Sequence, residues 1–189
     1  MIKEKELYSF PGHAQKLSAR HLVDPQHKVN IQSLKETLET VIRESGLPAT
    51  IAEDTLSFKT GLLSSGKAPC WVISHMQEPK DFRSMVIAVK EASDGCILTM
   101  GWYGQSKVDK QLEKLNKGEA RADRQFDKAQ GSGDMLDIVS HGAGGLLQGM
   151  KNKALMKKID SRADLEAGYH DGVINTVVTV CARLQGLLS

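Results

Sequence analysis

Apolar and polar residues alternate along the stretch from Ala68 to Gly104, and such alternation is typical of β-strands. One strand-like run covers 70–76, and two more lie on either side of Asp94-Gly95. An Asp-Gly pair between alternating runs favours a two-residue hairpin turn. The pattern therefore predicts a tight hairpin at Asp94-Gly95, with Ser93 opposite Cys96.

The predicted hairpin collects apolar side chains on one face of a sheet. A turn at Asp94-Gly95 places Val89 opposite Met100, and alternate residues of each strand point to the same side. The residues gathered on this face are Met85, Ile87, Val89, Met100 and Trp102. We expect this face to form the core.

The clearest helical pattern covers residues 31–45. Its apolar residues recur at three- and four-residue spacings, at Ile31, Leu34, Leu38, Val41 and Ile42. Asn30 is a suitable N-cap, and Gly46 followed by Pro48 provides a stop. The pattern predicts a helix that covers one face of the sheet.

The remaining strand pattern lies between this helix and the hairpin. Leu56 and Phe58 alternate with polar residues near the end of a predicted strand over 49–59. The fold class expected is therefore α+β, with an antiparallel meander of about four strands packed by the 31–45 helix. Closer to the start of the chain, the pattern favours a short strand over 6–10 and a helix over 13–23.

Charge-rich helical patterns replace the strand patterns after Gly104. Ser106 and Asp109 have the spacing of a capping box at the start of a helix, and a linker is predicted at 131–133. Ser161 has the same spacing to an acidic residue. This predicts that the final helix starts there and completes an αα-hairpin joined near Asp160.

These elements suggest two parts of the chain. We expect an α+β sheet module over 1–117 and a helical extension over 118–189 that ends in the αα-hairpin. The extension either packs on the sheet as one domain or stands apart.

Composition and charge exclude several classes of protein. The chain of 189 residues is 40% hydrophobic and 25% charged, which is ordinary for a globular protein, and its formal charge of +2 does not indicate a nucleic-acid partner. The pattern contains neither a signal-peptide core nor a membrane-spanning run, so we expect a cytoplasmic protein. The cysteines Cys70, Cys96 and Cys181 lack metal-ligand spacing, and we expect buried, reduced thiols without a metal or cofactor.

No catalytic pair is evident from spacing. Cys70 and His75 are five residues apart on one predicted strand, so their side chains point to opposite faces. A site assembled from distant residues would use His75 and His141 as its candidate catalytic residues.

Aromatic residues on the predicted sheet are the candidate ligand-binding residues. They are Trp71, His75, Trp102 and Tyr103. Aromatic side chains on a sheet can stack against flat ligands, but the inward position of Trp102 favours a role in the core.

The segment 135–158 suggests contact with a membrane or a partner. Its candidate contact residues are Leu146, Leu147, Met150, Lys151, Lys153, Lys157 and Lys158. An apolar helix followed by lysines is typical of interfacial helices, although lysines also stabilise a helix C-terminus.

We hypothesise that the chain is a non-catalytic binding or interaction protein. Its contact would be a small apolar ligand, a protein partner or an anionic membrane surface. A protein partner includes a second copy bound through the apolar stripe over 165–184. The alternative is a small-molecule enzyme with a site assembled from remote residues.

Overall fold

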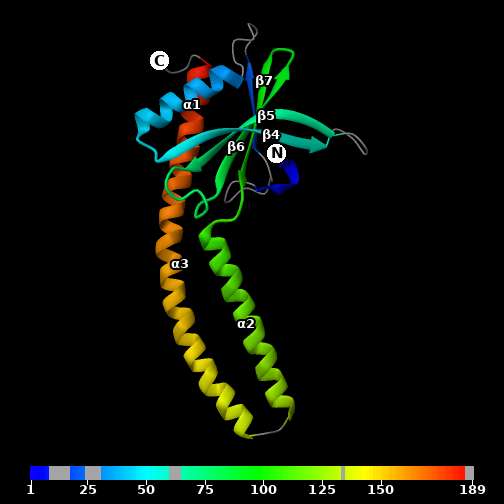
Figure 1. The fold of residues 1–189 in the computed structure, drawn as a ribbon, viewed down its shortest axis with the longest axis vertical. Helices are drawn as coiled ribbons and strands as arrows, with labels where there is room; N and C mark the ends of the chain where they lie inside the picture. The colour runs from blue at the N-terminus through cyan, green and yellow to red at the C-terminus, as the bar shows by residue number, and fades with distance from the viewer. Residues whose placement is uncertain (9–17, 24–30, 60–64, 133–134, 186–189) are drawn as a thin grey trace. The chain divides into compact units, whose positions relative to one another are not determined.

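The computed structural model describes residues 1–8, 18–23, 31–59, 65–132 and 135–185, with the side chains of 8, 18–23, 91–92, 119 and 121–152 left out. Within these ranges the chain is α+β, with a mixed sheet and long helices in its C-terminal half (Figure 1). It divides into two compact units. The first unit combines Met1–Gln105 with Gly168–Ser189, and the second is Ser106–Ala167.

The elements follow one another along the chain. The first unit contains β1 (Ile2–Lys3), the 3-10 turn η1 (Glu4–Glu6), β2 (Leu7–Tyr8), β3 (Ser18–Val23), α1 (Ile31–Ser45), β4 (Ala49–Lys59), β5 (Ser65–His75), β6 (Ser84–Ala92) and β7 (Gly95–Tyr103). Helix α2 (Lys107–Ser132) belongs to the second unit, and α3 (Met135–Leu184) contributes to both.

The sheet contains the predicted meander and additional strands. Strands β4, β5, β6 and β7 pair antiparallel in chain order, which confirms the meander. Strand β1 runs parallel to β4 and makes the sheet mixed, while β2 and β3 both pair with β7. Strands as short as β1 and β2 give no periodicity to detect. The helix predicted over 13–23 is wrong for 18–23, because pairing with β7 makes that segment a strand; 13–17 lies outside the described residues.

The hairpin between β6 and β7 is confirmed, but its turn lies one residue earlier than predicted. Ala92 pairs with Gly95, so the two turn residues are Ser93 and Asp94. Val89 consequently lies opposite Leu98 instead of Met100. The partner changes by two residues, and an even shift leaves every side chain on its original face. The predicted apolar face is therefore correct, although the predicted register is not.

Both faces of the sheet are apolar. One face packs against α1 and the last part of α3, and its fully buried residues include Leu34, Leu38, Ile73, Met85, Ile87, Leu98, Trp102 and Val173. The opposite face carries a smaller cluster formed by Ile2, Leu7, Leu56, Ala68, Cys70, Val86 and Ala88. The C-terminal part of α3 in the first unit thus packs on the sheet, and the apolar stripe from Tyr169 to Val180 is occupied by contacts within the chain.

Helix α1 has the predicted bounds and is joined to the sheet by polar contacts as well. The indole N–H of Trp71 donates to the carbonyl of Ile31 at 3.1 Å. The ammonium of Lys35 lies 5.2 Å from the centre of the Trp71 ring and 3.5 Å from a carboxylate oxygen of Glu53. These contacts fix the start of α1 over β5.

The second unit is a helical hairpin formed by α2 and the first part of α3, which lie side by side (Figure 1). Val108 and Leu115 of α2 pack with Ile159 of α3. The predicted capping box is present: the Ser106 N–H donates to the Asp109 carboxylate at 2.9 Å, and the Asp109 N–H donates to the Ser106 hydroxyl oxygen at 3.1 Å.

The predicted join near Asp160 is wrong. Helix α3 continues without a break from Met135 to Leu184. Ser161 does not cap a helix start, because its hydroxyl donates to the carbonyl of Lys157 one turn earlier at 3.0 Å. The same Ser-x-x-Asp spacing is therefore compatible with a helix interior. Among the described helical residues, no segment combines the length and hydropathy needed to span a membrane.

Candidate functional site

A groove of about 530 Å³ lies in the first unit between the end of α1 and the start of β4. Its lining residues are Glu39, Ile42, Arg43, Gly46, Leu47, Pro48, Ala49, Ile51 and Met76. Most of these side chains are apolar, and the volume falls within the range of about 300–1,000 Å³ that is usual for small-molecule sites. The groove is therefore the candidate functional site.

The walls of the groove are positioned by the turn that ends α1. Gly46 has a φ of 66°, a left-handed conformation that favours glycine, and its N–H donates to the carbonyl of Arg43 at 3.4 Å. The Met76 N–H donates to the carbonyl of Pro48 at 2.8 Å, which joins the end of β5 to this turn. The backbone thus holds Leu47, Pro48 and Met76 around one space.

Apolar side chains form the deeper wall. Ile42 and Ala49 are buried, and Leu47 and Ile51 are partly buried against the same core. Met76 is different, since 57% of its surface is exposed. Met76 therefore offers a ligand an adaptable thioether surface.

Two side chains of opposite charge, both on α1, line the groove. Glu39 and Arg43 are one turn apart and both exposed. Neither forms an ion pair with another residue in the described part of the chain. The neighbouring Glu44, by contrast, pairs with Arg183 of α3 at 2.6 Å. The groove therefore combines apolar walls with one acidic and one basic group that a ligand can meet.

His75 lies outside this groove, in an aromatic cluster between the sheet and α3. Its ring stacks on Phe82 with centroids 4.5 Å apart and meets the edge of Tyr169 at 5.0 Å. Its Nδ1 accepts a hydrogen bond from the Glu78 N–H at 3.1 Å, which leaves the proton of the neutral ring on Nε2. These contacts do not pair His75 with a hydroxyl or thiol nucleophile.

Tyr169 is buried within the same cluster. Its hydroxyl has no hydrogen-bond partner in the described part of the chain. Burial raises the pKa of this phenol well above its usual range, because the phenolate would lose its hydration. Tyr169 therefore acts as a neutral, space-filling ring.

The other aromatic candidates are spread over both faces of the sheet. Trp102 is fully buried, as its inward position predicted, and its ring centroid lies 4.1 Å from that of His170. Trp71 is buried beneath α1. Tyr103 packs on the opposite face. Trp71, His75 and Trp102 thus share the helix-covered face without lining the groove, and Tyr103 is separated from them.

Several candidates lie where side chains are not described. These are His141, Leu146, Leu147, Met150 and Lys151. The backbone of all five belongs to α3. Lys153, Lys157 and Lys158 are described, and all three are exposed on α3.

The cysteines and acidic residues provide no candidate metal centre in the described part of the chain. Cys70, Cys96 and Cys181 are free and buried, in agreement with the prediction. Burial raises the pKa of the Cys70 thiol to about 11, and the Asp54 carboxylate adds to the increase. No group of three His, Cys, Asp or Glu residues is placed to hold a metal ion among the described residues.

Sequence reasoning did not identify the groove. The one signal in the sequence is Gly46-Leu47-Pro48, whose glycine and proline predict a helix stop but not a groove. A turn that follows an amphipathic helix and precedes a strand brings apolar residues of both elements together. Met76 could not be assigned to the same place, because that requires the pairing of β4 with β5.

Comparisons with known proteins give no relative: no family model, curated protein or solved structure matches the chain.

Proposed function

We propose that this chain is a non-catalytic binding protein whose groove between α1 and β4 receives a small apolar ligand with a polar head. The observation that carries the proposal is the combination of apolar walls with Glu39 and Arg43, which have no ion-pair partner in the described part of the chain. Small-molecule sites usually combine apolar walls with a few polar groups that orient the ligand.

The arrangement favours binding over catalysis. Apolar contact with Leu47, Ile51 and Met76 would supply most of the affinity, since burial of apolar surface contributes about 25 cal/mol per Å². Arg43 and Glu39 would orient the head group of the ligand. His75, the described histidine candidate for a catalytic role, does not line the groove.

An environment-sensitive dye tests the proposal directly. Anilinonaphthalene sulfonate carries a flat apolar body and a negative head, so we expect the folded protein to bind it with increased fluorescence. Met76→Glu places a charge in the apolar wall and should weaken binding by at least about tenfold, because a charge resists desolvation. Val178→Glu is the matched control, since Val178 is also exposed but does not line the groove.

Two variants of α1 separate groove binding from general dye adsorption. Arg43→Gln should weaken binding of the negative dye, and Glu39→Gln should strengthen it, each by about two- to fivefold for an exposed charge. Equal effects of Met76→Glu and Val178→Glu, or no response to either α1 variant, would show that the dye binds elsewhere and would remove the proposal.

A further inference from the structure

The described part of the α2–α3 hairpin presents a stripe of lysines. Lys107, Lys110, Lys114 and Lys117 follow one another on α2 at spacings of three and four residues, so they share one side of the helix. All four side chains are exposed. Lys117 forms an ion pair with Glu113 at 2.5 Å and marks the edge of the stripe.

A matching stripe runs along α3. Lys158, Arg162 and Leu165 are four and three residues apart and therefore also share one side. Lys158 is exposed, Arg162 is partly buried, and 65% of the surface of Leu165 is exposed. Leu165 is thus an apolar side chain left in water beside basic ones.

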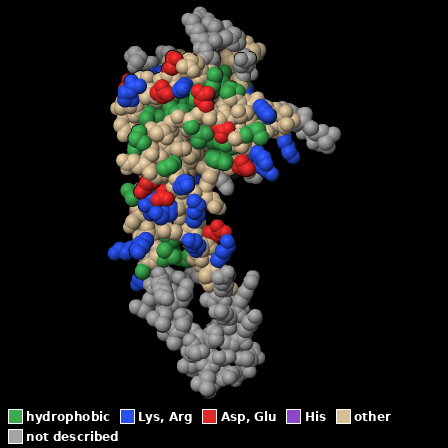
Figure 2. Space-filling view, viewed as in Figure 1, with side chains coloured by type: hydrophobic (Ala, Val, Ile, Leu, Met, Phe, Trp, Pro, Cys, Tyr) green, Lys and Arg blue, Asp and Glu red, His purple; other side chains and the backbone are tan. Residues whose placement is uncertain are grey.

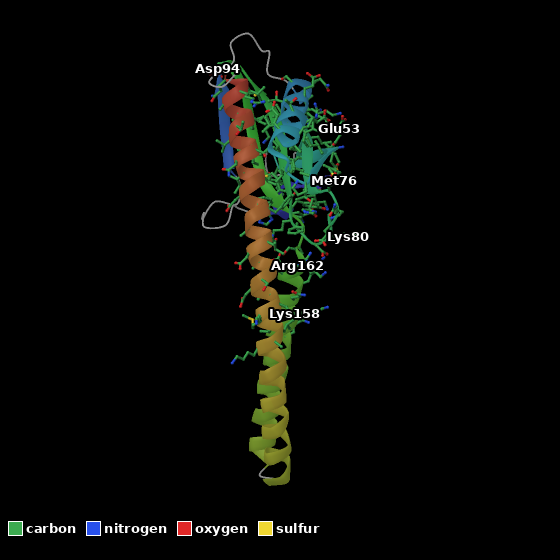
Figure 3. The ribbon with its side chains drawn as sticks, turned by 90° about the vertical axis from the view of Figure 1, so that its left-hand side faces the viewer. Glu53, Met76, Lys80, Asp94, Lys158 and Arg162 are labelled. Atoms are coloured by element: carbon green, nitrogen blue, oxygen red, sulfur yellow. The ribbon has the colours of Figure 1, made fainter. Side chains whose placement is uncertain are left out.

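The two stripes border the same face of the hairpin. Lys107, Lys114 and Lys158 each directly precede a residue that packs between the helices, so each lies about 100° from that residue, and the antiparallel course of the helices turns all three to one side. Lys110 lies further round α2, about 160° from Val108. Lys158 and Arg162 lie on the right of α3 in Figure 3. That side faces the viewer in Figure 2, which shows Lys and Arg side chains over the helices. We call Lys107, Lys114, Lys158, Arg162 and Leu165 the basic face.

Two exposed acidic side chains of α3 near Lys158 lie away from this face. Asp160 and Asp164 are two and six residues from Lys158, positions that turn them to the other side of α3. The basic face therefore brings basic side chains close to the exposed side chain of Leu165.

We propose that the basic face docks the protein on an anionic lipid bilayer. Clusters of four or more basic side chains on a helical surface are attracted to anionic lipids, and an apolar side chain among them can enter the boundary of the head groups. The exposed basic residues of the face are lysines rather than arginines, and it carries no aromatic side chain. Nucleic-acid sites favour arginine for paired hydrogen bonds and aromatic rings for stacking, so lipid fits this face better.

Vesicle flotation of the full chain tests the proposal. We expect the protein to float with vesicles of equal parts phosphatidylcholine and phosphatidylserine and not with phosphatidylcholine alone. Salt at about 1 M should release it, because the screening length falls to about 3 Å. Each lysine near the surface should contribute about fivefold to the binding constant, so Lys107→Gln with Lys114→Gln should weaken binding about 25-fold.

A second pair of lysines on the same hairpin provides the matched control. Lys153 and Lys157 are exposed on α3 but point away from the basic face, and replacing both with glutamine removes the same charge. This control should retain most of the binding, whereas Leu165→Ala should weaken binding several-fold at unchanged charge. Equal losses from the two lysine pairs, or no flotation of the original protein, would overturn the proposal. Retention on duplex DNA that depends on Lys107 and Lys114, without vesicle binding, would assign the face to nucleic acid and overturn it as well.

Discussion

A methyl group added to Gly172 of α3 would come within 2.8 Å of Cδ1 of Leu47, which lines the groove between α1 and β4. Real Cβ atoms do not approach other atoms so closely, so the Leu47 side chain would have to move. Because Cδ1 is the end of a flexible side chain, the move costs little. The absence of a side chain at Gly172 therefore leaves room for Leu47 in its present position in the groove wall.

Gly172→Ala should preserve the fold and weaken binding of anilinonaphthalene sulfonate. Alanine favours a helix interior over glycine by about 0.5–1 kcal/mol, and this gain should offset the cost of moving Leu47. We expect a free energy of unfolding within about 1 kcal/mol of the original value, measured by urea titration, and a dye affinity lowered several-fold.

Gly168→Ala is the control for this substitution. An added Cβ there meets nothing within 4 Å, so the variant should gain about 0.5–1 kcal/mol in the free energy of unfolding and leave dye binding unchanged. If both variants changed dye binding equally, the contact between Gly172 and Leu47 would not shape the groove.

Tyr169→Phe should leave stability unchanged or increase it by up to about 1 kcal/mol. The variant removes a buried hydroxyl that has no hydrogen-bond partner in the described part of the chain, and an unpaired buried polar group is costly. Tyr169→Ala, which removes the ring, should cost about 3–5 kcal/mol. Chemical denaturation measures both, and a loss above about 1 kcal/mol for Tyr169→Phe would indicate that the hydroxyl is bonded.

Ser106→Ala should destabilise the second unit by about 1 kcal/mol, because it removes the acceptor of the capping box that begins α2. Ser161→Ala should be neutral or slightly stabilising, because Ser161 lies inside α3 and alanine is the better helix former. Circular dichroism during urea titration distinguishes the two variants. A cost of about 1 kcal/mol for Ser161→Ala would instead support a helix start near Asp160.

Cys70 should resist alkylation in the folded protein. Its pKa is raised by burial from the ordinary 9.0 to about 11, so the reactive thiolate near pH 8 is about 100-fold scarcer than in an ordinary thiol. Mass spectrometry of the peptide that contains Cys70, after iodoacetamide treatment with and without denaturant, measures the difference. Rapid labelling in the folded protein would contradict the burial of this thiol.

The same shift predicts a change in stability at high pH. The folded state holds the Cys70 proton more tightly than the unfolded state does, so the contribution to stability is complete below pH 9.0 and is lost as the pH rises towards about 11. Cys70→Ala should remove this part of the decline in denaturation experiments across that range. A decline identical in both proteins would assign the loss to other groups.

Local periodicity was sufficient to predict the helix over 31–45 and the apolar face around Ile87 and Trp102. Both depend on side chains a few residues apart, which the sequence displays directly. The hairpin register was not predictable in the same way, because moving the turn from Asp94-Gly95 to Ser93-Asp94 leaves every residue on the same face. Hydrophobic patterning cannot distinguish registers that differ by an even number of residues.

The spacing of residues along the sequence could not predict the groove or the continuity of α3. Leu47 and Met76 are far apart in sequence and are brought together by the pairing of Ala49 with His75 and the hydrogen bond from Met76 to Pro48. Ser161 has the spacing of a cap but bonds to the preceding turn. The groove therefore depends on contacts between distant segments, and the role of Ser161 depends on which hydrogen bond its hydroxyl forms.

The most direct test of the groove as a ligand site is a methyl NMR titration of the full chain with anilinonaphthalene sulfonate. We expect the largest shifts at the methyl groups of Leu47, Ile51 and Met76, and we expect those of Leu47 and Ile51 to disappear in Met76→Glu. Shifts centred on other methyl groups, with those of the groove unchanged, would contradict it.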